Sequence, residues 1–464
     1  MMPLKLSVLG VRGVVGEALT PEMVAGFAGA FGTYAGGGRI CIARDTRPSG
    51  EMLRSALLSG LIATGCQVED MGVCLTPSLQ WWIKEQGAAG GIALTAGHNS
   101  EEWNAIKFFG LEGRMLNAYQ GEELLDVYHA GDFTKAPWDK LSWLKELPGS
   151  AGEAHSRAVL AAIDVSAIRA ARFRVAVDCC NGAMSTLLVT FLRESLGCTV
   201  YPINNDPRER FPHTPEPNPT NMSQVKALVD ATGADVGFCL DADGERVSVV
   251  TNEGTALSEE VTLCLAALDR LDPEGPYGAA DAGPVVANVS TTLAIDEICR
   301  SFGVPCFRSR VGQPYLVEAL GEQQAKLAGE GSGGIIWPEL HTAQDALMTI
   351  CRLLEGRAKA SRPFSYAASR VPNYFRVKQS VQAPPERAYT ILQRVREQAE
   401  EDAENEGATL DLTEGVRWVW PDASVHVRSS LTEPIIRILA EAKSQERAQQ
   451  LCTLHAARLH ARLA

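Results

Sequence analysis

Short apolar runs alternate with helical patterns along most of the chain. The first cycle places strand-like runs at 39–43 and 91–95 around a helical pattern at 51–64. Later cycles predict strands at 174–177, 199–203, 236–240, 284–289 and 304–308, with helices at 184–196, 222–231 and 291–302. This alternation is typical of βαβ units, whose sheets are buried and mainly parallel. The pattern therefore predicts a series of α/β domains.

The C-terminal stretch has a different pattern. It predicts a strand at 374–381, a helix at 385–401, a hairpin formed by 415–420 and 424–427, and a closing helix to residue 464. This is an α+β unit. Breaks in the pattern fall near 148–152, 252–256 and 360–372. We therefore expect four domains, at 1–150, 151–255, 256–370 and 371–464.

Composition narrows the class of protein. A chain of 464 residues suggests three or four domains. Its 43 basic and 56 acidic residues give a formal charge of −13, which argues against nucleic-acid binding, because such binding needs a basic face. No apolar run is long enough for a membrane helix, and the N-terminus lacks the pattern of a signal peptide. The 12 cysteines have neither disulfide-framework nor zinc spacing. These features favour a cytoplasmic enzyme with no membrane partner.

An acidic loop directly follows the apolar run at 236–240. Asp241, Asp243 and Glu245 alternate along it, so their carboxylates can converge on one hard cation. A calcium-binding EF-hand is excluded, because Arg246 and Asn252 stand where that loop needs Gly and Glu. Since ligands of α/β sheets bind at the carboxyl ends of strands, the loop predicts a Mg²⁺ site open to a phosphate.

The segment 95–107 places His98 and Lys107 after another strand-like run. Both side chains can transfer protons or contact phosphate. Taken alone, a capped turn followed by a surface lysine is the better interpretation.

Residues 428–434, with Arg437 shortly after them, form a candidate phosphate cradle. Arg428 and Arg437 supply guanidinium groups, which match phosphate oxygens, and Ser430 and Thr432 supply hydroxyl groups. Glu433-Pro434 then begins a strand or a helix.

The glycine-rich run 329–334 matches a dinucleotide-binding pattern by its letters. It follows a helical segment and precedes a strand-like run, which is the reverse of what that motif requires. Hydrogen bonding of Glu330 and Ser332 to sugar hydroxyl groups fits this loop better.

In order and spacing, these motifs resemble those of the α-D-phosphohexomutases, the family of phosphoglucomutase, phosphomannomutase and phosphoglucosamine mutase. Residues 10–13 resemble the opening motif of the family, and 43–49 its G-R-D-T-R-x-S run, with Ala43 in the first place. Residues 95–107, 241–246, 329–334 and 428–434 fall on the catalytic, metal, sugar and phosphate motifs. The residues within these motifs are most similar to those of the archaeal-type phosphoglucosamine mutase and phosphomannomutase branch.

The resemblance implies three related α/β/α domains with mixed sheets plus a C-terminal α+β domain, heart-shaped around a central cleft. It implies an isomerase that interconverts hexose or hexosamine 1-phosphate and 6-phosphate through a bisphosphate, as an intramolecular phosphotransferase with Mg²⁺. The expected partner is the sugar phosphate, with no nucleic acid and no membrane, and the enzyme would be a monomer or a homodimer.

Roles follow from the resemblance, position by position. The metal ligands would be Asp241, Asp243 and Glu245. Phosphoryl transfer would take place at position 97, assisted by Arg12, His98, Lys107 and Arg246. Glu330 and Ser332 would bind sugar hydroxyl groups, and the non-transferred phosphate would be held by Arg428, Ser430, Thr432 and Arg437.

This sequence departs from the family at four notable positions. Gly97 replaces the phosphorylated serine, Glu245 the third aspartate, Leu431 a loop glycine and Gly334 a histidine. Glu245 keeps the negative charge, so we expect the metal site to survive. Gly97 has no side chain and cannot form a phosphoenzyme.

Several functions remain open at this stage. The chain could be a mutase that uses His98, Ser100 or Thr95, or a bisphosphate sugar, as phosphoryl donor. It could be a non-catalytic phosphosugar-binding or regulatory homologue, an ordinary mutase with an engineered Gly97, or a metal-dependent sugar phosphatase. Because Arg12, Lys107 and the binding loops are retained, we expect a mutase-type activity rather than binding alone.

Overall fold

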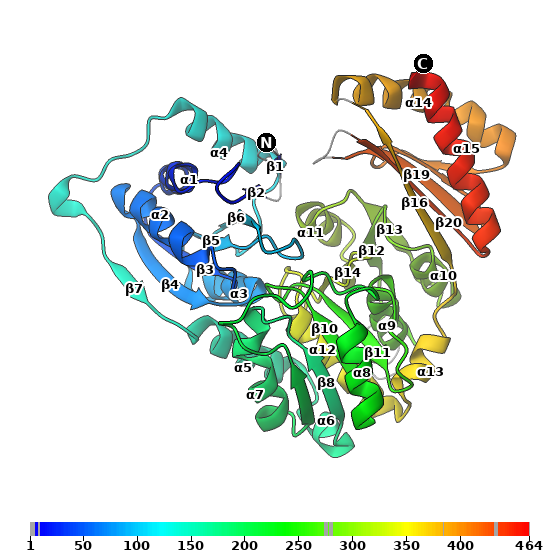
Figure 1. Ribbon diagram of the computed structural model, residues 1–464, viewed down its shortest axis with the longest axis horizontal. Coiled ribbons are helices and arrows are strands. Elements are labelled where there is room, and N and C mark those ends of the chain that lie inside the picture. Colours follow the sequence, from blue (N-terminus) through cyan, green and yellow to red (C-terminus); the bar gives the residue numbers. More distant parts are fainter. Residues whose placement is uncertain are drawn as a thin grey trace.

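The computed structural model describes residues 5–7, 10–272, 277, 282–383, 385–430 and 435–463. These residues form four separate sheets of seven, four, four and five strands. Figure 1 shows the N-terminal and C-terminal sheets in the two upper parts of the molecule, with the second and third domains below and between them. The predicted fold class, three α/β/α domains followed by an α+β domain, is confirmed. No helix among the described residues is long and apolar enough to cross a membrane.

The first domain is built on a seven-stranded sheet of order β1-β2-β6-β5-β3-β4-β7. Along β3, Ile40 and Ile42 join the core beneath α1 and α2, while Cys41 and Ala43 join the core beneath α3. This strand alternation places helices on both faces. Its strands are β1 (Lys5–Ser7), β2 (Gly10–Val14), β3 (Arg39–Arg44), β4 (Gln67–Val73), β5 (Gly90–Leu94), β6 (Trp103–Gly110) and β7 (Leu144–Glu146). Its helices are α1 (Pro21–Tyr34), α2 (Gly50–Ala63), α3 (Thr76–Gln86), α4 (Ala118–Ala130) and the 3₁₀ turn Trp138–Lys140.

The second domain has a four-stranded sheet of order β11-β10-β8-β9, in which only β11 is antiparallel. Its strands are β8 (Arg174–Asp178), β9 (Thr199–Ile203), β10 (Val236–Leu240) and β11 (Val247–Thr251), and its α-helices are α5 (Ser150–Ala162), α6 (Val165–Ala171) and α8 (Ser223–Thr232). The helix expected at 184–196 is irregular: a 3₁₀ turn (Ala183–Thr186), a short α7 (Leu188–Thr190) and a π turn (Phe191–Ser195). Its first turn is hydrogen-bonded to the acidic loop 241–246, because the Ala183 amide donates to the Ala242 carbonyl (2.8 Å).

The third domain repeats this plan with the order β13-β12-β14-β15, and β15 is its antiparallel strand. Its strands are β12 (Val285–Asn288), β13 (Cys306–Ser309), β14 (Leu327–Gly329) and β15 (Ile335–Ile336), and its helices are α9 (Glu260–Leu271), α10 (Ala294–Ser301), α11 (Gln313–Glu322), α12 (Ala346–Ala360) and α13 (Phe364–Ser369). The prediction that the glycine-rich run follows a helical segment is wrong, because β14 comes directly before it. The run still precedes a strand, so it lacks the helix that a dinucleotide motif requires.

The C-terminal sheet is antiparallel, with the order β16-β20-β19-β18-β17. Its strands are β16 (Phe375–Gln382), β17 (Thr409–Asp411), β18 (Val416–Val419), β19 (Ala423–Ser429) and β20 (Ile435–Ala442). Helices α14 (Pro385–Glu406) and α15 (Gln445–Leu463) cover its apolar face, which is buried in a single core. Strand β17 was not predicted from the sequence, and the segment after Pro434 was left open as a strand or a helix; β20 is a strand.

All four motif loops connect antiparallel hairpins. Residues 95–102 join β5 to β6, 241–246 join β10 to β11, and 330–334 join β14 to β15. The phosphate loop lies between β19 and β20 in the same way. Because a hairpin returns the chain to the same sheet edge, each loop is fixed at both ends by strand pairing.

Candidate active site

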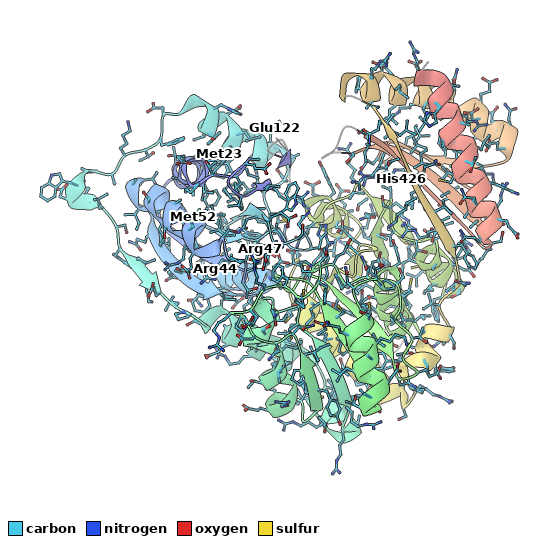
Figure 2. The ribbon with its side chains drawn as sticks, in the orientation of Figure 1. Met23, Arg44, Arg47, Met52, Glu122 and His426 are labelled. Atoms are coloured by element: carbon cyan, nitrogen blue, oxygen red, sulfur yellow. The ribbon has the colours of Figure 1, made fainter. Side chains whose placement is uncertain are left out.

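The loop after β5 is held in place by a buried arginine, Arg47 (Figure 2). Its Nε donates to Asp45 Oδ2 at 2.9 Å. Its terminal nitrogens donate to four carbonyls of the loop: those of Gly97 and Asn99 at 2.7 Å, Ser100 at 2.5 Å and Trp103 at 3.1 Å. One guanidinium group therefore fixes the path of the backbone from residue 97 to residue 103.

Gly97 has a φ of +55°, in the left-handed region that glycine adopts without strain. A Cβ built at this position would meet only the carboxylate of Asp243, at 3.6 Å from Oδ1 and 3.9 Å from Oδ2. These are ordinary van der Waals distances. The missing side chain would therefore point at the acidic loop of the second domain.

The acidic loop folds around Asp241, whose Oδ1 accepts the backbone amides of Gly244, Glu245 and Arg246 at 3.0–3.2 Å. One oxygen of each predicted metal ligand is buried and has no hydrogen-bond partner: Asp241 Oδ2, Asp243 Oδ1 and Glu245 Oε1. Burying an unpaired carboxylate oxygen is costly, and a bound cation removes that cost. The residues present therefore fit a Mg²⁺ ion.

Lys107 projects from β6 into this acidic loop. Its ammonium group lies 2.7 Å from Asp243 Oδ2 and 2.8 Å from Glu245 Oε2. Burial opposes the charge, but the two carboxylates together raise the pKa of Lys107. Burial alone would raise the pKa of Asp243, whereas Lys107 and a hydrogen bond from Thr76 lower it to about 2. Lys107 is therefore protonated and held between two acids.

The acidic loop is not among the described clusters whose three donor atoms all lie within 4.8 Å of one another. Those clusters are His155, His341 and Asp345, and Asp178, His213 and Cys239. With Lys107 pairing two of its acids, the acidic loop is arranged around an ammonium group.

His98 and Arg246 connect this acidic centre to a cavity of about 600 Å³. Arg246, burial and Arg12 together hold the pKa of His98 well below its usual value. The imidazole is therefore neutral and carries a nitrogen lone pair. Arg12 itself donates to Asn99 Oδ1 at 2.7 Å and is not among the residues lining the cavity.

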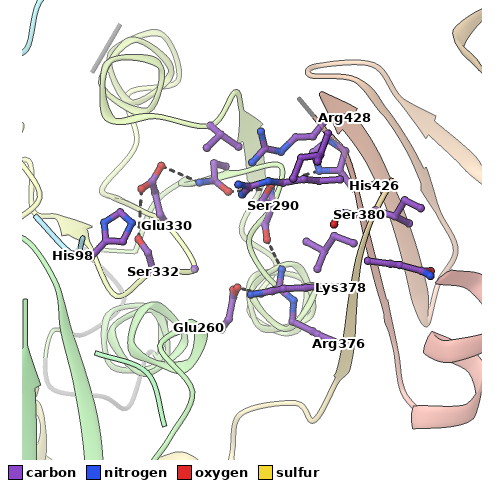
Figure 3. Close-up of a pocket in the computed structure, with 18 of the residues that line it drawn as sticks. His98, Glu260, Ser290, Glu330, Ser332, Arg376, Lys378, Ser380, His426 and Arg428 are labelled. Carbon is purple, nitrogen blue, oxygen red and sulfur yellow. Dashed lines mark hydrogen bonds and ion pairs between the residues drawn. The ribbon is translucent and has the colours of Figure 1, made fainter. Parts of the chain in front are cut away.

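The sugar-loop prediction also falls on this cavity, which Glu330 and Ser332 both line (Figure 3). The Glu330 Oε1 atom accepts from Asn288 Nδ2 (2.9 Å) and from the Gly312 amide (3.1 Å), and Oε2 accepts from Gln344 Nε2 (3.1 Å). The carboxylate is thus fixed in place, as a group that reads sugar hydroxyl positions needs to be.

The predicted phosphate cradle contributes both arginines to the cavity. Arg428 and Arg437 are directly paired across β19 and β20, so their side chains share one sheet face. Ser430 directly follows β19, its amide donates to the Ile435 carbonyl (2.9 Å), and it does not line the cavity. Thr432 and Leu431 lie outside the described residues.

Comparisons with known proteins agree with this geometry. Family models for phosphoglucomutase/phosphomannomutase α/β/α domains I, II and III match residues 5–135, 153–254 and 260–374, and the model for the C-terminal domain of the same family matches 375–456. The chain belongs to this family. The family's enzymes interconvert sugar phosphates, and the resemblance stated from the motifs is confirmed.

Individual relatives cover nearly the whole chain. A phosphoglucomutase/phosphomannomutase of Thermococcus kodakarensis is 35% identical over 451 residues, 96% of both chains. A probable phosphoglucosamine mutase of Methanopyrus kandleri is 34% identical, over 95% of this chain and 94% of the relative. The crystal structure of a family protein from Burkholderia thailandensis superposes with a TM-score of 0.83 at 26% identity, over 98% of this chain and 96% of that one.

Several cavity residues of this phosphoglucomutase/phosphomannomutase homologue were not predicted from the sequence. The most notable are Arg376 and Lys378 of β16 and His426 of β19 (Figure 3). Alternation could have found the β16 residues, because Val377 and Val381 pack on the domain core, so Arg376, Lys378 and Ser380 point to the other face. That polar face looks into the cavity.

Proposed function

We propose that the chain is a Mg²⁺-dependent phosphohexomutase that interconverts hexose 1-phosphate and 6-phosphate through a bisphosphate. One observation carries the proposal: His98 and Arg246, which border the acidic centre, line the same cavity as Glu330, Arg428 and Arg437. One bisphosphate molecule can therefore place its reacting phosphate at one end of the cavity and its retained phosphate at the other.

The acidic loop supports the metal assignment. Asp241, Asp243 and Glu245 would hold Mg²⁺ through their unpaired buried oxygens. A bound Mg²⁺ supplies positive charge that offsets the charge developing on a transferring phosphoryl group. The chain's own contributions come from Arg246, a cationic side chain at the cavity wall, and from Lys107, which holds a proton beside the acids.

The phosphoryl carrier is where this chain must differ from a serine-bearing enzyme. Thr95 is unsuitable, because its hydroxyl is buried and donates to Asp45 Oδ2 (2.6 Å) while accepting the Gly97 amide (3.0 Å). The Ser100 hydroxyl donates to Glu102 Oε1 (2.7 Å), and Ser100 does not line the cavity. His98 does line it, and its imidazole is neutral.

We therefore assign His98 as the substitute carrier. An imidazole nitrogen attacks phosphorus and forms the N–P bond, while the O–P bond to the sugar breaks. The departing sugar oxygen takes a proton, which Lys107 can donate. In the other half-reaction the free hydroxyl group of a bound hexose monophosphate attacks the phosphohistidine: the new O–P bond forms, the N–P bond breaks, the hydroxyl proton returns to Lys107, and the bisphosphate is regenerated. Arg428 and Arg437 hold the phosphate that is not being transferred.

The decisive experiment follows both carrier and product. The protein is incubated with Mg²⁺ and glucose 1,6-bisphosphate, and its intact mass is measured at neutral pH before and after acid treatment. We expect one added phosphoryl group, located on His98 by peptide mapping and lost in acid, together with interconversion of hexose 1- and 6-phosphates by ³¹P NMR.

Other outcomes separate the alternatives. Interconversion without a protein-bound phosphoryl group would overturn the His98 assignment and favour direct transfer from the bisphosphate. Release of inorganic phosphate would favour a sugar phosphatase. Tight binding of sugar phosphates with neither reaction would make the chain a phosphosugar-binding homologue.

A further inference from the structure

The cavity carries an excess of positive charge. Its basic lining side chains are Arg246, Arg376, Lys378, Arg428 and Arg437. Its acidic ones, among the described residues, are Glu260 and Glu330. A phosphate group at the cradle and another at the acidic centre account for Arg428, Arg437 and Arg246. Arg376 and Lys378 on β16 have no role in binding these two phosphate groups.

Both acids of the cavity are already engaged. The Glu330 carboxylate accepts four hydrogen bonds from protein groups on its two oxygens, including those from Asn288 and Gln344. Glu260 forms an ion pair with the Arg376 guanidinium through Oε1, and its Oε2 accepts the Thr292 amide at 2.9 Å. A cationic ligand would have to break one of these arrangements to gain a carboxylate partner.

Lys378 differs from its neighbour. It stands two residues after Arg376 on the same face of β16, it is exposed to the cavity, and it forms no hydrogen bond or ion pair with any described residue (Figure 3). Its ammonium group is therefore uncompensated. Like charges within about 10 Å at an effective dielectric constant near 20 repel strongly enough to change an affinity by about tenfold.

We propose that Lys378 makes the cavity selective for hexose phosphates whose ring substituents are uncharged. The chemical class is glucose or mannose phosphate, with a hydroxyl group at carbon 2, and the disfavoured class is glucosamine phosphate, with an ammonium group there. This inference rests on the proposed function, because it concerns the substrate of the same cavity. The names of the relatives span both classes, so homology leaves the choice open.

The repulsion acts on an ammonium group within about 10 Å of Lys378, whereas a hydroxyl group or a neutral amide experiences none. Charge is therefore predicted to matter more than size: N-acetylglucosamine 6-phosphate should escape the electrostatic penalty that glucosamine 6-phosphate meets.

Calorimetric titration of the full chain with Mg²⁺ tests the proposal. The ligands are glucose 6-phosphate, glucosamine 6-phosphate and inorganic phosphate, at a pH where the amine is protonated. We expect glucose 6-phosphate to bind at least about tenfold more tightly than glucosamine 6-phosphate. In Lys378→Gln that ratio should shrink severalfold, and in Lys378→Glu it should reverse. Lys226→Gln, which changes a surface lysine paired with Asp230, is the matched control and should keep the wild-type ratio.

Equal or tighter binding of glucosamine 6-phosphate by the wild-type protein would overturn the proposal, and so would an unchanged ratio in Lys378→Gln. If a Lys378 variant does not fold, the wild-type protein alone still tests the proposal. The ratio of its affinities for glucose 6-phosphate and glucosamine 6-phosphate should decrease at a pH where the amine is neutral. A ratio that does not change with pH contradicts the inferred role of charge. Failure of the proposed function looks different. In that case no sugar phosphate would bind better than inorganic phosphate, or sugar phosphates would bind with this selectivity but not interconvert.

Discussion

Restoring a serine at position 97 tests whether the rest of the phosphoryl-transfer apparatus is intact. In Gly97→Ser the new Cβ would lie 3.6 Å from Asp243 Oδ1 and 3.9 Å from Oδ2, so no neighbour has to move. The remaining cost is conformational, because a φ of +55° places a side-chain-bearing residue in the left-handed region, at about 1 kcal/mol or slightly more. For a domain of this size, that corresponds to a fall in Tm of about 2–4 °C.

The functional gain should outweigh this cost. The serine side chain would lie beside the Asp243 carboxylate, whose Oδ1 has no hydrogen-bond partner and whose Oδ2 accepts from Lys107. We expect the introduced serine to be phosphorylated by glucose 1,6-bisphosphate and kcat for interconversion to rise by at least about tenfold, equivalent to about 1.4 kcal/mol of activation free energy. Gly97→Ala is the matched control: it introduces the same backbone strain and lowers Tm equally, but it offers no hydroxyl group.

The assay combines a thermal melt, intact-mass analysis with peptide mapping, and ³¹P NMR of the sugar phosphates. If Gly97→Ser melts like Gly97→Ala but is neither phosphorylated nor faster, the geometry around position 97 does not serve phosphoryl transfer. If both variants lose far more stability than a few degrees, the space inferred around Gly97 is wrong.

Three further predictions follow from buried groups. Arg47→Ala should lower the free energy of unfolding by about 3 kcal/mol or more in urea denaturation, because it strands the buried Asp45 carboxylate and four loop carbonyls, whereas Arg174→Ala at an exposed ion pair should change little. Burial lowers the pKa of His341. Burial would raise the pKa of Asp345, but His155 and His341 lower it. As the pH falls, the unfolded chain therefore binds protons at these two groups before the native state does. Stability should accordingly decline below about pH 6.5 and further below about pH 4, and the first decline should be shallower in His341→Gln; a decline of equal slope would contradict this. Adding Mg²⁺ should raise Tm, by an amount equivalent to about 2.7 kcal/mol at a hundredfold excess over Kd, and Asp241→Asn should abolish the shift; a shift that persists would mean the ion binds elsewhere.

The local chemistry of the site could be read from the sequence because each motif is short and contiguous. Asp241, Asp243 and Glu245 are brought together by one loop, and so are Glu330 and Ser332. Contacts between distant segments could not be read in this way. The ion pairs of Lys107 with Asp243 and Glu245 span 136 and 138 residues, and they join a strand of the first domain to the acidic loop of the second.

Functional polar residues also explain why some strands were not predicted. Strand β6 (Trp103–Gly110) carries Asn104 and Lys107, which interrupt its apolar pattern. In the C-terminal sheet the strand that was missed, β17 (Thr409–Asp411), has three residues, which are too few to show an alternating pattern. Strand β16 was predicted, but the roles of Arg376 and Lys378 were not, because charged residues that alternate with apolar ones also occur on strands whose polar face meets solvent.

The loss of the nucleophile at Gly97 is structurally inexpensive, which explains how the surrounding site can persist without it. Arg47 holds the loop through backbone carbonyls, and the Gly97 amide is bound by the Thr95 hydroxyl; none of these contacts uses a side chain at position 97. A serine there would adopt a left-handed conformation at a cost in stability, which glycine avoids. A glycine at position 97 therefore costs the loop none of these contacts. Because the loop does not need a serine at position 97, the site can serve either substrate binding alone or phosphoryl transfer through another carrier. Phosphorylation of His98 would distinguish the second case from the first.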